Sequence, residues 1–296
     1  MAQTEIFFRP PSEAESFIVR VMHGCPHNAC TFCSMFKDIP CKVLPLEEVL
    51  DSLETDARYL GPRFIPKVQS MYLEGGDPLA IGSKHLLSVM NHARRLYPGL
   101  DRFACYATAR FTIKKKPAEL SVLAKAGLRR VYVGLESGLD TILESAKKGC
   151  TSADLMLAGK MLADAGIEMD VSILLGIGGK RYSSAHALMT AQLLDALEPD
   201  CVRIRTFVPK AGTELGADYL QGNFVLMGPH EILQELYQMV EHMHGKTRLL
   251  SEHWTDFIFF DAQMPLGKAP LLALIQQHLE LPESSFRAVG LADSKD

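Results

Sequence analysis

Residues 17–36 read FIVRVMHGCPHNACTFCSMF and join a strand pattern to a cysteine-rich loop. Residues 17–22 are mostly apolar and β-branched, as in a strand that is covered on both faces. Cys25, Cys30 and Cys33 follow in the spacing C-x4-C-x2-C. In parallel α/β barrels the loops after the strands carry the functional site. We therefore expect the site of this protein to include these three cysteines.

Strand patterns and helix patterns alternate along the rest of the chain. Further strands are predicted at residues 70–73, 102–106, 130–135, 170–175 and 201–208, and helices at 46–60, 83–96, 117–126, 152–165, 184–197 and 229–244. This alternation predicts parallel βαβ units with right-handed crossovers. A closed eightfold barrel needs two more units, so we predict an α/β fold with a partial (β/α)6 TIM-like barrel over residues 1–215. Residues 216–296 are then a C-terminal extension that covers or packs against the barrel, and a doubly wound open sheet is the alternative fold.

Composition excludes several classes of function. The chain has 296 residues, is 47% hydrophobic and has a formal net charge of −4, which gives no field for nucleic acid or an anionic membrane. No apolar stretch approaches the length of a membrane span, and the N-terminus lacks the pattern of a signal peptide. The basic run at residues 114–116 lacks interleaved aromatic residues. We expect a cytoplasmic protein that acts on a small molecule.

Clustered cysteines in a cytosolic chain indicate a metal site before disulfides. Three thiolates at this spacing can hold a [4Fe–4S] cluster and leave its fourth iron open to an outside ligand such as S-adenosylmethionine (SAM). A zinc site completed by His23 or His27 is the alternative, although zinc sites favour paired C-x2-C motifs and no second pair is present.

The cysteine loop resembles that of the radical SAM superfamily, including the aromatic Phe32 before the third cysteine. It has one residue more between Cys25 and Cys30 than the usual C-x3-C-x2-C. The resemblance implies a [4Fe–4S] cluster, SAM as cofactor with Phe32 at its site, and a reductase, ferredoxin or flavodoxin as electron donor.

Later motifs follow the order of that family. Gly75, Gly76 and Asp77, after the second strand, resemble the element that receives the SAM amino group, although the same residues also form ordinary turns. Residues 133–138 (VGLESG) with Lys147-Lys148-Gly149 resemble the stretch that meets the ribose and methionyl part of SAM. There the resemblance implicates Glu136 and Ser137, and helix capping is the other reading.

The segment after the fifth strand resembles the family's adenine contact and implicates Ile177 and Gly178. His186, beyond it, is expected at the surface or at a helix cap. Arg203 and Arg205 share one face of the sixth strand. If they point inward, Arg203 is assigned to SAM and Arg205 to substrate; a buried Asp or Glu, or outward ion pairs, are the alternatives.

Substrate contacts are assigned to side chains at the mouth of the barrel. Tyr106 and Arg110 lie at the end of the third strand, and His253 and Trp254 belong to the C-terminal segment, where core packing of an extra strand is the alternative. The leading hypothesis is a radical SAM enzyme acting on a small, anionic substrate. A zinc-stabilised binding or scaffold protein and an iron–sulfur electron carrier that does not cleave SAM are the other two.

Overall fold

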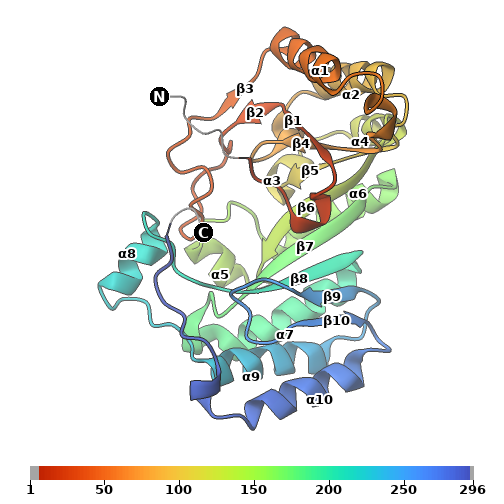
Figure 1. The fold of residues 1–296 in the computed structure, drawn as a ribbon. Helices are drawn as coiled ribbons and strands as arrows, with labels where there is room; N and C mark the ends of the chain where they lie inside the picture. Colours follow the sequence, from red (N-terminus) through yellow and green to blue (C-terminus); the bar gives the residue numbers. More distant parts are fainter. Residues whose placement is uncertain (1–6, 294–296) are drawn as a thin grey trace. The chain divides into compact units, whose positions relative to one another are not determined.

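The computed structural model describes residues 7–293 as two compact units (Figure 1). The first unit comprises the described residues up to Asn28, Phe36–Val133 and Met161–Glu168, and the second comprises Ala29–Met35, Gly134–Lys160 and the residues from Met169 onward. Residues 1–6, within the stretch that lacks a signal-peptide pattern, lie outside the described residues.

Parallel strands form the framework of the first unit. They are β1 (Phe17–Arg20), β4 (Ser70–Glu74), β5 (Arg102–Ala107) and the first part of β6 (Leu128–Glu136), with a short antiparallel pair of β2 (Met22–His23) and β3 (Lys42–Val43). The helices are α1 (Leu46–Leu60), α2 (Ser83–Leu96), α3 (Ala109–Thr112) and α4 (Pro117–Lys125). Short 3₁₀ turns lie at Pro11–Glu13, Ile65–Lys67 and Pro78–Ala80.

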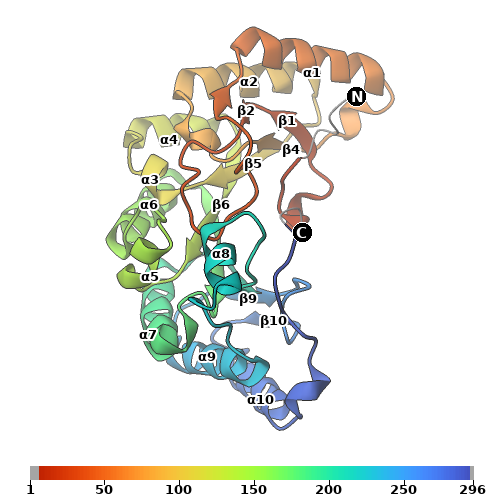
Figure 2. The same ribbon diagram turned by 90° about the vertical axis from the view of Figure 1, so that its left-hand side faces the viewer.

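The core of the first unit lies between its strands and its helices. Helix α1 buries Val49, Leu53 and Ala57 along one face, and the chain leaves the helix at Gly61, whose φ of 70° suits a residue without a Cβ. Helices α1 and α2 pack side by side in both ribbon views (Figures 1 and 2). Strand β4 is buried along nearly its whole length, as a strand with both faces covered must be.

Helices cover the strands of the second unit. The strands are β7 (Glu168–Leu175), β8 (Cys201–Thr206), β9 (Arg248–Ser251) and β10 (Phe260–Gln263); β7, β8 and β9 are parallel, and β10 is antiparallel to β9. The helices are α5 (Asp140–Ser145), α7 (Gly179–Leu197), α8 (Glu214–Leu220), α9 (Pro229–His242) and α10 (Lys268–Leu279), with a 3₁₀ turn at Glu283–Ser285. Helix α6 (Ser152–Ala165) belongs to this unit up to Lys160. Helix α9 packs against both α7 and α10 (Figure 2).

The mixed α/β fold with a mostly parallel sheet confirms the predicted class. The strand order is β1-β4-β5-β6-β7-β8-β9-β10, which follows the order of the sequence without reversal. A doubly wound sheet reverses its strand order at a switch point, and this sheet does not. Among the described residues no pairing joins β1 to β10. All six predicted strands are present, and β9 and β10 extend the sheet beyond them.

Candidate functional site

The glycine turn after β4 packs directly on the first cysteine in the first unit. The Gly76 N–H donates to the Gly24 carbonyl at 2.9 Å. A Cβ added at Gly76 would lie 2.5 Å from both Cα and Cβ of Cys25. Only glycine therefore allows this turn to approach the cysteine so closely. The sequence motifs at Cys25 and at Gly75-Gly76 form one local structure.

Asp77 anchors the same turn from inside the protein. The side chain has no solvent exposure, and its Oδ2 accepts hydrogen bonds from Thr108 N–H at 2.9 Å and from Thr108 Oγ1 at 2.6 Å. Burial raises the pKa of the Asp77 carboxyl to about 7, although the hydrogen bonds from Thr108 act to lower it. Asp77 thus joins the loop after β4 to the end of β5, and the sequence did not reveal this partnership.

The other two cysteines belong to a segment, Ala29–Met35, that is fixed within the second unit. The Thr31 N–H donates to the Ala146 carbonyl at 3.0 Å, and the Leu215 N–H donates to the Thr31 carbonyl at 2.9 Å. Phe32 packs against a buried apolar cluster (Ile142, Ala146, Ile177 and Phe207). Cys30 and Cys33 flank these anchors and are partly exposed.

A buried ion pair lies beside this segment. Lys148 Nζ lies 2.8 Å from Glu136 Oε1, and the two side chains are 9% and 8% exposed. The ammonium also lies 5.7 Å from the centre of the Phe32 ring. Burial opposes the charge on Lys148, but the negative charges of Glu136 and Cys30 raise its pKa above the ordinary value. The charge of Lys148 thus interacts with the Cys30 side chain as well as with Glu136.

A second buried polar network holds the loops that follow β6 and β7. Ser137 Oγ lies 2.8 Å from His186 Nδ1, and Ser137 has no solvent exposure. Glu235 Oε1 accepts from the Gly176 N–H at 2.7 Å and lies 3.7 Å from His186 Nε2. Burial lowers the pKa of His186 to about 4 and raises that of Glu235 to about 7. Both are therefore mostly neutral in mildly acidic solution.

The expected place of His186 at the surface or at a helix cap is wrong, because its side chain is fully buried between α7 and α9. Glu235 was missed by the sequence analysis. The sequence does contain a sign of Glu235: a carboxylate that lies on the apolar face of a helix. Ile232, Leu236 and Met239 are buried residues of the same helix.

The two arginines on β8 have different surroundings. Arg203 is 8% exposed and pairs with Glu252 and, at 3.8 Å, with Asp170. One partner is therefore a buried carboxylate, Asp170, as one of the sequence alternatives proposed, and the other, Glu252, is exposed. Arg205 lies near His253, where it acts to lower the pKa of the imidazole.

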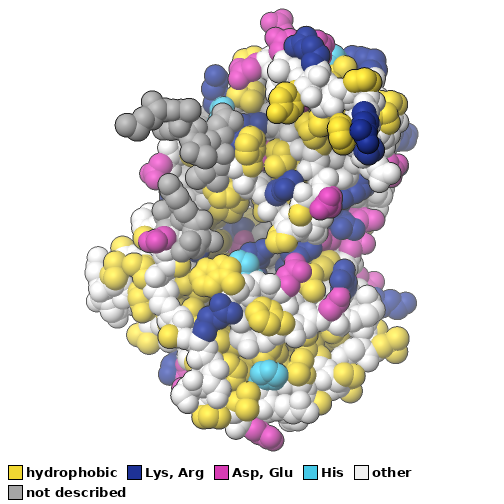
Figure 3. Space-filling view, in the orientation of Figure 1, with side chains coloured by type: hydrophobic (Ala, Val, Ile, Leu, Met, Phe, Trp, Pro, Cys, Tyr) yellow, Lys and Arg dark blue, Asp and Glu magenta, His cyan; other side chains and the backbone are white. Residues whose placement is uncertain are grey.

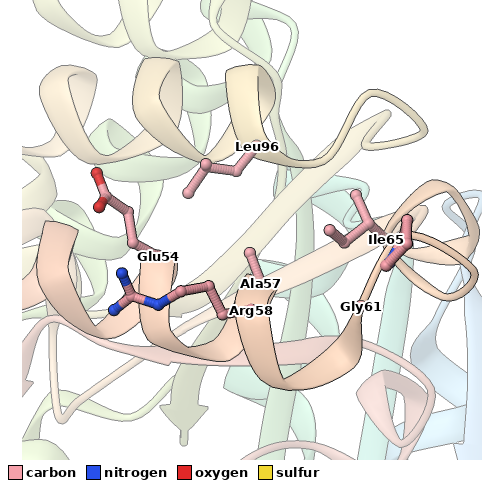
Figure 4. Close-up of a pocket in the computed structure, with 7 residues that line it drawn as sticks. Glu54, Ala57, Arg58, Gly61, Ile65 and Leu96 are labelled. Atoms are coloured by element: carbon pink, nitrogen blue, oxygen red, sulfur yellow. The ribbon is translucent and has the colours of Figure 1, made fainter.

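The remaining substrate candidates lie on different parts of the first unit. Tyr106 packs with Tyr72 and Tyr132, with ring centres 5.8 and 6.3 Å away. Arg110 is exposed and lies over the Phe111 ring at 5.9 Å. A groove of about 350 Å³ lies between the last turns of α1, the chain that follows it and Leu96 of α2 (Figure 4). It touches none of the candidate residues.

Donor chemistry allows the three thiols to be cluster ligands. All seven cysteines lie in the described part of the chain, and none forms a disulfide. Within residues 7–293 no three His, Cys, Asp or Glu side chains form a metal-binding group in this arrangement. Cys25 belongs to the first unit, whereas Cys30 and Cys33 belong to the second.

The surface charges and the hydropathy of the helices do not indicate a particular class of ligand. On the face drawn in Figure 3, Lys and Arg side chains lie beside Asp and Glu side chains rather than in a single basic area. None of the helices over residues 7–293 is long and apolar enough to cross a membrane.

Comparison with known proteins gives one family and several relatives. The sequence profile of the radical SAM superfamily matches residues 19–192. The heme chaperone HemW of Bacillus subtilis (strain 168) is 24% identical over 225 residues, which are 73% of this chain and 56% of that protein. The chain therefore spans little more than half the length of this curated relative.

Two solved structures have the same fold at low sequence identity. TsrM from Kitasatospora setae, a radical S-adenosylmethionine methyltransferase solved with cobalamin and a [4Fe–4S] cluster, superposes with a TM-score of 0.55 at 18% identity, over 70% of this chain and 39% of that chain. Coproporphyrinogen III oxidase (HemN) from Escherichia coli, a radical SAM enzyme, superposes with a TM-score of 0.55 at 15% identity, over 76% of this chain and 52% of that chain.

Proposed function

Since the chain belongs to the radical SAM superfamily of enzymes, we propose that Cys25, Cys30 and Cys33 hold a [4Fe–4S] cluster that cleaves SAM reductively, for radical chemistry on a small, anionic substrate. The observation that carries the proposal is the close packing of Gly76 on Cys25, because it joins the cysteine loop to the second family motif. A glycine turn in contact with a ligand cysteine exposes backbone groups to whatever the cluster binds.

Cys25, Cys30 and Cys33 would hold the cluster through three of its irons, and the remaining iron would be open to SAM. When bound, the cluster supplies the electron that breaks a carbon–sulfur bond of SAM. The chain's own contribution begins with charge: Lys148 stabilises the thiolate of Cys30, and Glu136 keeps that ammonium in place. The glycine turn at Gly75 and Gly76 offers backbone groups to the SAM amino group.

Other residues would hold the nucleoside part of SAM. Glu136, whose Oε1 pairs with Lys148, would use its second carboxylate oxygen for a ribose hydroxyl, and Ile177 and Gly178 would contact the adenine. The apolar cluster around Phe32 and Ile177 excludes water from this side. Arg203 reaches the SAM carboxylate only if it leaves one of its own carboxylate partners.

Asp77 and Ser137 act as positioning residues in this proposal. Both are fully buried, and their side chains hold other parts of the chain, namely Thr108 for Asp77 and His186 for Ser137. These two residues would therefore act on SAM binding indirectly, because they hold in position the loops that carry the SAM-contacting groups.

The substrate is assigned to the C-terminal side of the chain, with Arg205 and His253 as anion contacts and with Tyr106 and Arg110 as further candidates. In this proposal residues 1–215 form the radical SAM core and residues 216–296 the extension that receives substrate. The electron comes from a reductase, a ferredoxin or a flavodoxin, and the protein works in the cytoplasm.

The test is an anaerobic reaction of the iron-reconstituted chain with dithionite and SAM. The product is 5′-deoxyadenosine, measured by mass spectrometry. We expect release by the wild type and by Cys201→Ala, which removes a cysteine at the start of β8, and none by Cys25→Ala, Cys30→Ala or Cys33→Ala. A colourless protein that binds zinc, or an iron-loaded protein that leaves SAM intact, contradicts the proposal.

A further inference from the structure

Strands β2 and β3 form the neck of the loop that carries the three cysteines. They pair antiparallel with His23 opposite Lys42, so the next residue on each strand brings Gly24 opposite Cys41. The packing agrees with this register, because a Cβ added at Gly24 would lie 3.0 Å from both N and Cα of Cys41. Gly24 directly precedes Cys25. A fourth cysteine, Cys41, therefore lies across the hairpin from Cys25.

Hydrogen bonds hold the chain that leads to Cys41. The Phe36 carbonyl accepts from Asn28 Nδ2 at 2.8 Å and from the Ile39 N–H at 3.1 Å. Cys25 and Cys41 both belong to the first unit. The approach of these two cysteines is thus set by local hydrogen bonds and strand pairing inside one unit.

The distance across the hairpin suits a disulfide. Opposite Cα atoms of an antiparallel pair lie about 4.5–5.5 Å apart, and Cys25 is one residue beyond such a pair. A disulfide joins Cα atoms that are up to about 7 Å apart. Gly24 has a φ of 66°, so the alternation of side-chain directions along β2 does not continue past it to Cys25.

The two thiols differ in exposure. Cys41 is exposed and Cys25 is half-buried, and both are free thiols in this structure. Burial raises the pKa of the Cys41 thiol, and the negative charge of Cys25 raises it further, which agrees with the short separation of the two side chains. The proposed function gives Cys41 no role, because its three ligands are Cys25, Cys30 and Cys33.

We propose that Cys41 is a site of reversible disulfide formation with Cys25 in the iron-free protein, driven by a low-molecular-weight disulfide such as oxidised glutathione. The inference rests on the proposed function, in which Cys25 is a cluster ligand. The disulfide removes one of the three ligands, so the chain accepts a cluster only after a thiol has reduced the bond. Disulfides of cytosolic proteins are typically transient and redox-sensing in this way.

The reaction is a pair of thiol–disulfide exchanges. The thiolate of the exposed Cys41 attacks one sulfur of oxidised glutathione, whose sulfur–sulfur bond breaks as the first glutathione leaves. The thiolate of Cys25 then attacks Cys41 Sγ, and the second glutathione leaves. Two protein thiols are oxidised to one disulfide, one glutathione disulfide is reduced to two thiols, and the two protons pass from the protein to glutathione.

Trypsin separates the two cysteines and makes the bond directly observable. Cleavage after lysine and arginine leaves Cys41 alone in residues 38–42, whereas Cys25 and the other two ligands share residues 21–37. The iron-free full chain is treated with oxidised glutathione, its free thiols are blocked with N-ethylmaleimide, and the digest is analysed by tandem mass spectrometry. We expect a species in which the two peptides are joined, with fragmentation that places the bond at Cys25 and dithiothreitol that removes it.

Other oxidation products overturn the proposal. A disulfide closed within residues 21–37 while Cys41 remains free is one such result. Cys41 that ends with glutathione attached, or that is joined to Cys30 or Cys33, is another. A dimer on a non-reducing gel would show pairing between two copies of the chain and would count against the proposal as well.

A variant separates the pairing from simple oxidation of Cys25. After the same treatment, less than half of Cys25 should react with N-ethylmaleimide in the wild type, and more than half in Cys41→Ser. Cys201→Ala, at a buried cysteine of the second unit, is the control and should behave as the wild type does. Equal loss of Cys25 reactivity in Cys41→Ser and in the wild type overturns the proposal.

These experiments need neither iron nor SAM. A chain that forms the disulfide but takes up no cluster would contradict the proposed function alone. A chain that cleaves SAM but never joins Cys25 to Cys41 would contradict only the present inference. The two failures are therefore distinguishable.

Discussion

Gly76 occupies a place where the protein leaves no room for a side chain. The Cβ of an alanine would lie 2.5 Å from two atoms of Cys25, and one of these is backbone. The Gly76→Ala variant must therefore displace Cys25 or the turn. We expect it to retain less than half of the wild-type iron after anaerobic reconstitution, measured by a colorimetric iron assay.

Gly82→Ala is the matched control for this experiment. Gly82 precedes α2 with a φ of −58°, and a Cβ there meets nothing within 4 Å. Its iron content should equal that of the wild type. Full iron loading in Gly76→Ala would show that the contact with Cys25 does not serve the cluster.

Lys148 and Lys147 are adjacent residues whose ion pairs differ in burial. Lys148→Met leaves the carboxylate of Glu136 buried without its cation, which costs about 3–5 kcal/mol. The Lys147–Glu214 pair is more than half exposed, so Lys147→Met should cost less than about 1 kcal/mol. Urea unfolding followed by circular dichroism gives both free energies, and equal losses in the two variants would contradict the buried pair.

At the scale of elements, His186 on α7 and Glu235 on α9 join the loops after β6 and β7. Each group resists ionisation because it is buried, and the two have opposite effects on the pH dependence of stability. Folded Glu235 keeps a proton between pH 4.5 and about 7 that the unfolded chain has lost, so this residue makes the free energy of unfolding fall as pH rises. Folded His186 stays uncharged between pH 6.5 and about pH 4, where the unfolded chain binds a proton. This residue therefore makes the free energy of unfolding fall as pH falls.

Glu235→Gln isolates the contribution of the carboxyl. The variant retains an oxygen that can accept from the Gly176 N–H, but it does not titrate. The difference in unfolding free energy, variant minus wild type, should rise between pH 4.5 and 8, by about 1–3 kcal/mol. Glu241→Gln, at an exposed position of the same helix, should show no pH-dependent difference. A flat difference for Glu235→Gln would mean that its carboxyl is ionised throughout.

At the scale of the whole molecule, the sequence predicts the parallel framework well because period and length are local properties. The helix predicted at residues 184–197 begins earlier, at Gly179, since the glycine-rich turn after β7 leads directly into it. Strands β9 and β10 have four residues each, which makes them too short to be assigned from their own pattern.

The site is predictable where residues adjacent in sequence do the chemistry. The cysteine loop and the glycine turn are such motifs. The partners of Asp77 and Ser137 are not, because Thr108 lies 31 residues from Asp77 and His186 lies 49 residues from Ser137. Lys210 and Arg287 come to lie over the Trp254 ring only through the tertiary fold, since neither residue is in a motif of its own.

The central claim is that three cysteines leave one iron of a [4Fe–4S] cluster open to SAM. Electron paramagnetic resonance of the reconstituted, dithionite-reduced chain, recorded before and after SAM is added, tests it most directly. The claim predicts a reduced-cluster spectrum in the wild type that changes when SAM is added, and no such spectrum in Cys25→Ala. A cluster spectrum that SAM leaves unchanged, or one that persists in Cys25→Ala, would contradict it.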